Sequence, residues 1–216
     1  MKLSNRLVSI ANLVDSSDII ADIGCDHALL DIYLVKNKII NKSLACDINK
    51  NALDMGYKNI KKYNLEDKIE TLLCDGISLI EDEVNTLIIS GMGASTIIKI
   101  LSNDKINNIN KVITQSNNDY ELLRRYMINN GFYISYEESI CDNNKYYLNI
   151  VFKRGYKYYS NKEIRFGTKL LVDNCNYYKY LYDKYKFIYK NIPVYKFNKK
   201  LSLIKDIRYL KKLMNR

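Results

Sequence analysis

Histidine and paired cysteines, the residues that build metal sites and disulfide frameworks, are scarce in this sequence. The chain of 216 residues has one histidine, His27, and its five cysteines are odd in number, widely spaced and without a Cys-x-x-Cys pair. A zinc site or a disulfide framework is therefore not expected. We predict a protein that binds no metal.

Long apolar runs are missing as well. No stretch approaches the roughly 18 apolar residues that a membrane-spanning helix needs. Residues 1–18 carry an apolar face interrupted by Asn, Ser and Arg, unlike the continuous apolar block of a signal peptide. Hydrophobic residues still make up 47% of the chain, enough for the core of one α/β domain with an appendage. We therefore predict a cytoplasmic protein that does not enter a membrane.

Acidic residues become rare toward the C-terminus. Residues 153–216 hold 18 Lys and Arg against 4 Asp and Glu, a net charge of +14, whereas residues 1–152 hold 16 against 20, a net charge of −4. An AT-biased genome would explain why lysine replaces arginine, but not why acidic residues disappear. The asymmetry favours a basic appendage that binds a polyanion such as nucleic acid.

Apolar runs that suit buried strands alternate with helical periodicity up to residue 130. A first helix is predicted over residues 3–14. Strands are predicted at residues 19–23, 43–48, 69–74, 86–90 and 111–116. Further helices are predicted at residues 28–35, 52–63, 95–102 and 119–130. Strands that alternate with helices in this way imply a parallel sheet covered by helices.

Two longer strand-like runs follow, at residues 132–140 and 145–154, and the polar turn 141–144 joins them into a hairpin. Such a hairpin places an antiparallel strand near the end of the sheet. The predicted fold is therefore Rossmann-like α/β, with a seven-stranded, mostly parallel sheet in a domain of residues 1–155.

No strand is expected after residue 160, where apolar residues recur at helical spacing on both sides of Pro193. The expected buried stripes are Leu171, Asn174, Tyr178, Leu181, Tyr185, Ile188 and Ile192, then Phe197, Leu201, Ile204, Ile207, Leu210 and Met214. Two antiparallel helices in a coiled-coil-like hairpin would bury these stripes against each other. We predict that residues 156–216 form this basic hairpin and bind nucleic acid, with its tyrosines serving either as core or as stacking platforms for bases.

Gly24 follows the first predicted strand. A glycine turn between a strand and a helix lets the backbone approach a nucleotide-like ligand closely. The dinucleotide pattern Gly-x-Gly-x-x-Gly is absent, because Asp26 and Ala28 stand where further glycines are common. Asp26 would repel a pyrophosphate, whereas Asp22 or Asp26 would attract the sulfonium and the amino group of S-adenosylmethionine. The turn therefore favours S-adenosylmethionine as cofactor.

Two more carboxylates end predicted strands. Asp47 stands 23 residues after Gly24, where a carboxylate can accept the hydroxyl groups of a bound ribose. Asp75 ends the third strand and could accept the exocyclic amine of adenine. Each one alone could equally be a solvated helix cap. Their order on successive strand ends favours a nucleoside site.

The segment Gly91, Met92 and Gly93 follows the fourth predicted strand. It is either a substrate loop that a planar base approaches closely or a plain turn between a strand and a helix. His27, beside the predicted methyl donor, is either a general base or a structural residue. The sequence has no Asn/Asp-Pro-Pro-aromatic motif here, which disfavours methylation of an exocyclic base amine by that arrangement.

Taken together, these residues resemble the bacterial tRNA (adenine(22)-N1)-methyltransferase family. The resemblance is carried by residues 3–7, 22–34, 74–80, 88–101, 114–127 and 145–147 and by the helical tail after residue 165. The most specific matches are the Gly-x-Asp-His turn at residues 24–27 and the Gly-Met-Gly segment at residues 91–93. The chain departs from the family pattern at Cys25, where Ser is expected, and at Leu30 or Asp31, where Pro is expected.

This resemblance implies a class I methyltransferase fold, S-adenosylmethionine as cofactor, tRNA as substrate and N1 of adenine as the methylated atom. It implies catalytic roles for Asp26, His27 and Met92. The implied cofactor-binding residues are Gly24, Cys25, Asp26, Asp47, Ile48, Asp75, Gly76 and Gly91. The implied substrate-binding residues are Ser4, Arg6, Gly91, Met92, Gly93 and Tyr147.

Two alternative functions remain compatible with the sequence. A small-molecule methyltransferase on the same fold would account for the cofactor residues but would leave the basic tail unused. A non-catalytic tRNA-binding module would keep the fold without transferring a methyl group. In each case we expect a monomer.

Overall fold

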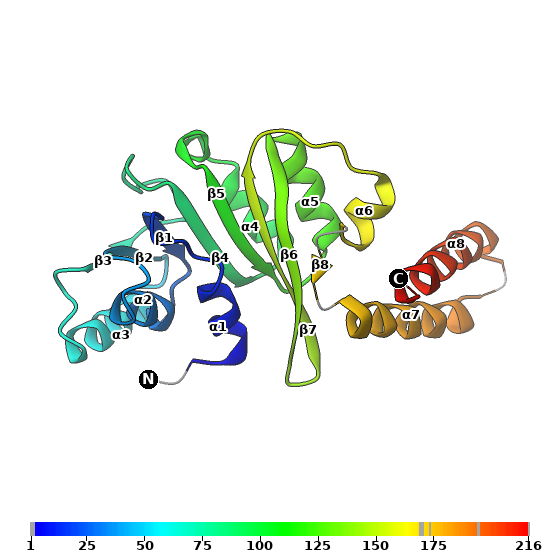
Figure 1. Cartoon of the computed structure of the whole chain (residues 1–216), viewed down its shortest axis with the longest axis horizontal. Helices are drawn as coiled ribbons and strands as arrows, with labels where there is room; N and C mark the ends of the chain where they lie inside the picture. Colours follow the sequence, from blue (N-terminus) through cyan, green and yellow to red (C-terminus); the bar gives the residue numbers. More distant parts are fainter. Residues whose placement is uncertain (1–2, 169–170, 173, 194, 216) are drawn as a thin grey trace. The chain divides into compact units, whose positions relative to one another are not determined.

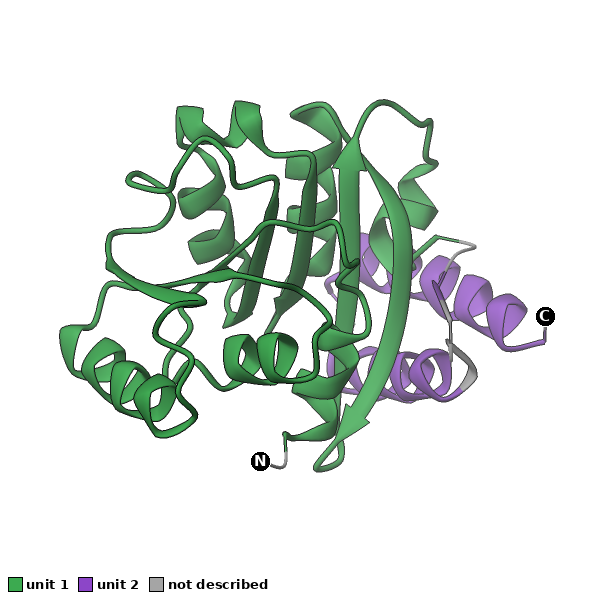
Figure 2. Cartoon of the chain, turned by 60° about the vertical axis from the view of Figure 1, so that its left-hand side comes forward, with its two compact units in different colours: residues 1–170 green, residues 171–216 purple. Residues whose placement is uncertain are grey.

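The computed structural model describes residues 3–168, 171–172, 174–193 and 195–215 (Figure 1). The chain divides into two compact units, residues 1–170 and 171–216 (Figure 2). None of the helices in these described ranges is long and apolar enough to cross a membrane.

A single twisted sheet organises the first unit. Its seven strands lie in the order β3 (Ile69–Leu73), β2 (Ser43–Asp47), β1 (Ile20–Ile23), β4 (Thr86–Met92), β5 (Lys111–Ser116), β7 (Lys145–Arg154) and β6 (Phe132–Asp142). The first five strands are parallel, and β7 runs antiparallel to both β5 and β6. This order confirms the predicted seven-stranded Rossmann-like fold. The order in which strands are added to the sheet reverses at β1, which pairs with β2 on one side and β4 on the other, and ligands bind at such switch points.

Helices form two packed groups around this sheet. One group is α1 (Asn5–Ala11), α2 (Leu29–Lys36) and α3 (Lys50–Lys62). The other is α4 (Ala94–Leu101), α5 (Tyr120–Asn129) and α6 (Asn161–Phe166). A large apolar core lies between the first group and the sheet, because residues of α1, α2 and α3 pack there with residues of β1 and β2.

Several boundaries differ from the predicted ones. The first helix is shorter than residues 3–14, since Ser4 caps α1 and the helix ends at Ala11. Strand β4 continues through Gly91 and Met92, where a turn was expected, because a register shift against β5 between Ser90 and Met92 accommodates the glycine. The short 3-10 helix η1 (Asp104–Asn108) and helix α6 have too few turns to produce a clear periodicity.

The hairpin of β6 and β7 is confirmed, but β6 continues through Cys141 and Asp142, which were predicted to belong to the turn. Its turn consists of Asn143 and Asn144, whose φ angles are +50° and +61°. Positive φ at both central residues matches the right-handed twist of the flanking strands, and asparagine tolerates it better than most residues.

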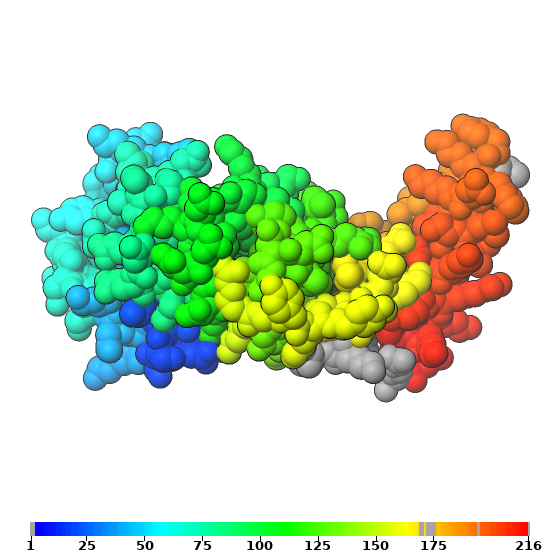
Figure 3. All heavy atoms as spheres, turned by 90° about the horizontal axis from the view of Figure 1, so that it is seen from above, coloured from blue at the N-terminus to red at the C-terminus, as the bar shows by residue number. Residues whose placement is uncertain are grey.

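Residues 156–168 belong to the first unit, so this unit extends beyond the predicted boundary after residue 155. Glu137 is fully buried, and its carboxylate accepts hydrogen bonds from Arg124 Nε at 2.6 Å and from the Thr168 backbone N–H at 2.7 Å. Arg124 also donates to the Ile164 carbonyl oxygen at 3.1 Å. We call Arg124, Glu137 and Thr168 the Glu137 clasp. Figure 3 shows this segment in yellow against the green atoms of α5 and β6.

The second unit is a helical hairpin of α7 (Asn174–Asn191) and α8 (Phe197–Met214), preceded by the short strand β8 (Leu171–Val172). The two helices are as predicted, and β8 corrects the expectation of no strand after residue 160, because two residues carry no periodicity. The Asn174 side chain lies outside the described part of the structure.

The buried stripe of α8 agrees with the predicted one only in part: Leu210 is buried as predicted, and Ile204, Ile207 and Met214 are half-buried. Phe197 and Leu201 are exposed, at 65% and 41%. The buried residues are Leu203, Asp206, Leu210 and Leu213. Their spacing of three and four residues defines a neighbouring helix face that also has helical period, so periodicity alone did not distinguish the two faces.

Candidate functional site

The turn after β1 has an unusual backbone. Gly24, Asp26 and Ala28 all have positive φ, at +78°, +51° and +52°. The backbone N–H groups of Gly24 and Cys25 both donate to the Cys46 carbonyl oxygen, at 2.8 and 3.0 Å. A non-glycine residue with positive φ is costly, so two within three residues indicate a turn held in shape by its surroundings.

Asp47, at the end of β2, holds this turn in place. Its Oδ2 accepts a hydrogen bond from the Asp26 backbone N–H at 3.0 Å, and its Oδ1 accepts one from the Asn49 N–H at 2.8 Å. Each carboxylate oxygen has a second lone pair, so Asp47 can accept hydroxyl groups without losing these bonds.

A cavity of about 360 Å³ opens beside the turn, at the carboxyl ends of β1, β2 and β4. Its lining residues are Arg6, Leu7, Asp22, Gly24, Cys25, Asp26, His27, Leu29, Leu30, Asp47, Ser90, Gly91 and Met92. We call it the carboxyl-edge cavity. It joins segments of α1, β1, β2 and β4 that are far apart in the sequence.

Asp22 is the buried acid of this cavity, with 5% of its surface exposed. Burial raises the pKa of its carboxyl well above the usual range, and the nearby carboxyls of Asp31 and Asp47 raise it further. Burial likewise raises the pKa of the Cys25 thiol, which therefore stays protonated at neutral pH.

The end of β4 closes one side of the cavity. Gly91 has a φ of +78°, and a Cβ on Gly24 would clash with Met92 Cε, so these chain segments are in close contact. Asn117 fixes this end of β4, because its side-chain amide donates to the Gly91 carbonyl and its backbone N–H donates to the Met92 carbonyl at 2.8 Å.

Arg6 reaches the cavity from α1. Its Nη1 donates to Gln115 Oε1 at 3.0 Å, and the fully buried Gln115 donates in turn to Asn149. The Arg6 guanidinium lies 5.6 Å from the centre of the Tyr147 ring. Lys145 lies on the same ring at 4.7 Å, so Tyr147 contacts two cations. The Arg6 guanidinium is thus held in position by a buried amide and an aromatic ring.

Asp26 and His27 are exposed at the mouth of the cavity. His27 Nε2 lies 3.6 Å from Asp26 Oδ1, and the two side chains are 45% and 70% exposed. The His27 carbonyl oxygen accepts a hydrogen bond from Asn59 at 3.1 Å. Within the described residues, no group of three or more His, Cys, Asp and Glu side chains is arranged to hold a metal ion.

The structure brings eight of the predicted site residues to this one cavity: Arg6, Gly24, Cys25, Asp26, His27, Asp47, Gly91 and Met92. Others lie elsewhere. Asp75 and Gly76 line a separate cavity beside α4. Ser4 is the N-cap of α1, Gly93 is the N-cap of α4, and Ile48 is 68% exposed.

Sequence reasoning did not assign a role to several polar residues around the site. Gln115, Asn117 and Asn149 fix Arg6 and the end of β4 through the hydrogen bonds described above. Gln115 and Asn149 are fully buried and face each other across β5 and β7. Their position within otherwise apolar strands could have indicated a role, because buried amides require hydrogen-bond partners.

Comparisons with known proteins agree with this geometry. Residues 3–150 match the family described as "Methyltransferase domain". A protein of Mycoplasma genitalium named putative tRNA methyltransferase MG248 is 34% identical over 157 residues, which are 70% of this chain and 70% of that protein. The Bacillus subtilis tRNA (adenine(22)-N(1))-methyltransferase is 28% identical over 158 residues, 72% of this chain and 66% of that protein.

Solved structures cover the whole chain. The structure of M. capricolum TrmK in complex with S-adenosyl-homocysteine is 32% identical, with a TM-score of 0.87 and coverage of 100% of this chain and 99% of that chain. Streptococcus pneumoniae Sp1610, a putative tRNA (m1A22) methyltransferase, is 27% identical, with a TM-score of 0.90 and coverage of 99% and 100%. These matches agree with the resemblance drawn from the sequence.

Proposed function

Since the chain belongs to the methyltransferase domain family, we propose that it transfers a methyl group from S-adenosylmethionine to N1 of adenine in tRNA. The proposed target is the adenine at tRNA position 22, the position that the name of the B. subtilis relative gives. The observation that carries the proposal is the carboxyl-edge cavity, built at the switch point of a chain that matches tRNA methyltransferases over its full length.

The residues of the cavity fit this cofactor. The close-packed, positive-φ backbone at Gly24 and Gly91 lets a ligand lie directly against the main chain. Asp47 offers free lone pairs for ribose hydroxyls, and Asp22 presents an acidic wall to a cationic ligand. We propose that Gly24, Cys25, Asp26, Asp47 and Gly91 hold the cofactor, which supplies an electrophilic methyl group on its sulfonium.

We propose that the adenine end of the cofactor contacts Asp75, Gly76 and Ile48. Asp75 and Gly76 follow β3, the strand next to β2, so they lie one strand further along the carboxyl edge than Asp47. Ile48 directly follows Asp47 and exposes an apolar side chain on which a base can rest.

The chemistry requires alignment more than proton transfer. N1 of adenine carries a free lone pair, so it can attack the methyl group without prior deprotonation. An in-line attack needs the reacting atoms about 3 Å apart and water excluded. We propose that Arg6, Met92, Gly93 and Tyr147 position the target base, with Ser4 fixing the start of the helix that carries Arg6.

Asp26 and His27 are proposed as catalytic residues at the cavity mouth. The methylated adenine is cationic at first, and both side chains are exposed where they can meet it. A carboxylate stabilises that charge, and a histidine can accept a proton near neutral pH. Replacing either residue by Ala should then reduce turnover far more than tRNA binding.

The second unit is proposed to bind the tRNA backbone. Residues 171–216 hold 12 Lys and Arg against 3 Asp, a net charge of +9. Phe187, Tyr195 and Phe197, at the loop end of the hairpin, are 69%, 80% and 65% exposed, and Lys196 lies 6.0 Å from the Tyr195 ring centre. Exposed rings flanked by lysines suit stacking on unpaired bases beside phosphates.

The salt dependence of tRNA binding tests this role. Replacing Lys196, Lys199 and Lys200 by Gln should weaken tRNA binding and reduce the slope of log affinity against log salt by about 2–3, one unit for each lost phosphate contact. The matched control replaces Lys58, Lys61 and Lys62 of α3 by Gln. Equal slopes in both triple variants would contradict the role of the hairpin.

Methyl transfer itself is tested with labelled S-adenosylmethionine and unmodified bacterial tRNA, followed by nucleoside analysis. Label in 1-methyladenine is expected, and a tRNA with guanine in place of the adenine at position 22 should remain unlabelled. Label in another nucleoside would contradict the assigned atom. Cofactor binding without any labelled tRNA would favour a small-molecule methyltransferase or a non-catalytic tRNA-binding module.

We further propose that the protein is a monomer. We also propose that it acts in the cytoplasm, where its tRNA substrate is found. Light scattering of the purified chain should give a mass near 25.3 kDa. A mass twice as large would contradict the monomer.

A further inference from the structure

Asp31 is a buried acid that the proposed chemistry does not use. It lies in α2, behind the wall of the carboxyl-edge cavity, and none of its surface is exposed. Its Oδ1 accepts a hydrogen bond from Ser43 Oγ at the start of β2. No backbone N–H, side-chain N–H or alcohol O–H among the described residues donates to its Oδ2. A buried carboxylate oxygen without a donor is costly, so this oxygen requires an explanation.

The neighbouring carboxyl of Asp22 explains how this Asp31 oxygen is tolerated. Asp22 lines the cavity, and it shares a sheet face with Ser43, the partner of Asp31, because Asp22 pairs with Ala45 two residues beyond Ser43 in β2. The Asp31 carboxyl is close enough to raise the pKa of Asp22 through its charge and through a hydrogen bond between the two carboxyls. Two carboxyl groups can form a hydrogen bond only when one of them carries a proton. The pair therefore shares a proton and holds a single negative charge, as close carboxyl pairs do elsewhere.

The surroundings decide where the proton and the charge lie. Burial raises the pKa of both groups, for Asp31 to about 6. The Ser43 hydroxyl donates to Asp31 and lowers its pKa, whereas the Asp31 and Asp47 charges raise the pKa of Asp22. The proton therefore rests on Asp22 and the charge on Asp31.

The other titratable and charged groups facing the pair come from each adjoining element. They are Arg6 of α1, Cys25, Asp26 and His27 of the turn, and Cys46 and Asp47 of β2. Cys25 stays neutral, as described above, and a hydrogen bond with Cys74 together with burial raises the pKa of Cys46. Asp26 and His27 are exposed, so solvent screens their charges.

We propose that Asp31 is a positioning residue that sets the charge of the cofactor wall through Asp22, so that the pair favours the cationic methyl donor over its neutral demethylated product. This rests on the proposed use of S-adenosylmethionine. The donor carries a sulfonium that S-adenosylhomocysteine lacks, and both ligands share all other groups. A wall with one negative charge therefore attracts the donor more strongly than the product, which helps the product leave.

The ratio of the two affinities measures this effect. Titration calorimetry of the full chain with each ligand, from pH 5.5 to 7.5, gives both dissociation constants. Protonation of Asp31 removes the charge of the pair, so the preference for the donor should fall as pH decreases through about 6. We expect a decrease of about threefold to tenfold in the affinity ratio.

Two variants should shift the pH dependence of this affinity ratio in opposite directions. In Asp31→Asn the amide can donate to Asp22, which loses a like-charged neighbour and ionises at lower pH, so the ratio should stay constant from pH 5.5 to 7.5. In Ser43→Ala the charged form of Asp31 loses its donor, so the midpoint should rise. Asp54→Asn, which removes an exposed carboxylate on α3, is the matched control and should keep the wild-type profile.

The outcomes separate this proposal from the proposed function. Wild-type profiles in both Asp31→Asn and Ser43→Ala, or shifts in the same direction, would overturn the role of Asp31 while leaving methyl transfer intact. Absence of binding of either ligand to the wild-type chain would instead contradict the cofactor itself. Thermal unfolding shows whether Asp31→Asn is misfolded. If it is, the proposal is tested by whether the pH midpoint of the affinity ratio rises in Ser43→Ala.

Discussion

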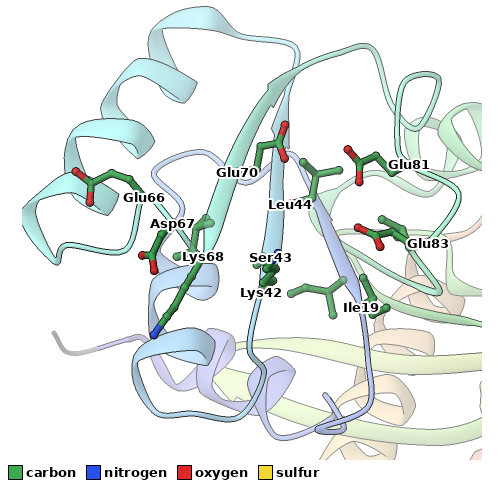
Figure 4. Close-up of a pocket in the computed structure, with 13 residues that line it drawn as sticks. Ile19, Lys42, Ser43, Leu44, Glu66, Asp67, Lys68, Glu70, Glu81 and Glu83 are labelled. Carbon is green, nitrogen blue, oxygen red and sulfur yellow. The ribbon is translucent and has the colours of Figure 1, made fainter.

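Two cavities lie at opposite edges of the same sheet, and the larger one lacks the features of a cofactor site. A cavity of about 440 Å³ lies at the amino ends of β1, β2 and β3, where its acidic residues Glu66, Asp67, Glu70, Glu81 and Glu83 stand around the rim (Figure 4). The carboxyl-edge cavity measures about 360 Å³. Size therefore does not distinguish them.

Backbone geometry does distinguish them. None of the residues lining the amino-edge cavity has positive φ, whereas Gly24, Asp26 and Gly91 of the carboxyl-edge cavity do. At the amino edge, a hydrogen bond that the Glu81 carboxyl donates to Glu83 and the charges of Glu70 and Glu83 raise the pKa of Glu81, because its like-charged neighbours disfavour its ionisation. At the carboxyl edge Asp47 is instead held by two backbone N–H donors, those of Asp26 and Asn49. A binding site needs hydrogen-bonding groups held in fixed directions, and cavity volume alone does not provide them.

Gly24→Ala should have the largest effect. A Cβ at φ +78° is strained by about 1–2 kcal/mol, and it would push Met92 Cε out of its place beside the cavity. We expect cofactor affinity to fall about 10- to 100-fold, by calorimetry. Gly131→Ala is the matched control, because Gly131 has the same φ of +78° at the end of α5, away from the cavity. Equal affinities in the two variants would show that backbone approach at Gly24 is not needed.

Asp47→Asn should have the second largest effect. The amide keeps one acceptor for the two backbone N–H groups of Asp26 and Asn49 and brings an N–H donor toward one of them. Cofactor affinity should fall about tenfold, as for a lost hydrogen bond to a charged group. Asp75→Asn, in the separate cavity beside α4, should cost less. A larger loss in Asp75→Asn would reverse this ranking of the two carboxylates.

Arg6→Ala should act on the substrate side. Its guanidinium is held by Gln115 and Tyr147 at the cavity, so its loss should lower kcat/KM for tRNA about tenfold and change cofactor affinity less than threefold. Lys145→Ala removes the other cation on the Tyr147 ring and serves as the control. If cofactor affinity fell in parallel with kcat/KM, Arg6 would belong to the cofactor side.

Glu70→Gln and Glu81→Gln at the amino edge should have the smallest effect. Neither side chain lines the carboxyl-edge cavity, so methyl transfer and cofactor affinity should change less than twofold. Removing either charge should relieve repulsion at Glu81 and leave stability equal or slightly higher, by thermal unfolding. A large loss of methyl transfer would mean that the amino edge takes part in function.

The sequence predicted the sheet because strands buried on both faces leave continuous apolar runs, and it predicted the turn because Gly24 and Asp47 stand at fixed distances from strand ends. Short elements such as α6 and β8 were missed because contacts distant in sequence define them. Helix α6, for example, is held by the Glu137 clasp, whose Arg124 donates to the Ile164 carbonyl oxygen.

Parts of the site were equally beyond sequence reasoning. Asp31 is the single acidic residue of a mostly apolar helix, and only the packing of α2 against β1 and β2 shows that it is buried near Asp22. The separation of Asp75 from Asp47 depends on how far β3 extends before its turn, which propensity does not determine.

The Glu137 clasp also has a consequence for how such a protein can change over generations. Its hydrogen bonds among Arg124, Glu137 and Thr168 lie wholly within the first unit and use no group of the hairpin. A hairpin of different length or charge can follow Thr168 while Arg6, Asp22 and Met92 keep their surroundings. Selection can therefore alter which nucleic acid is held without altering how the methyl group is placed.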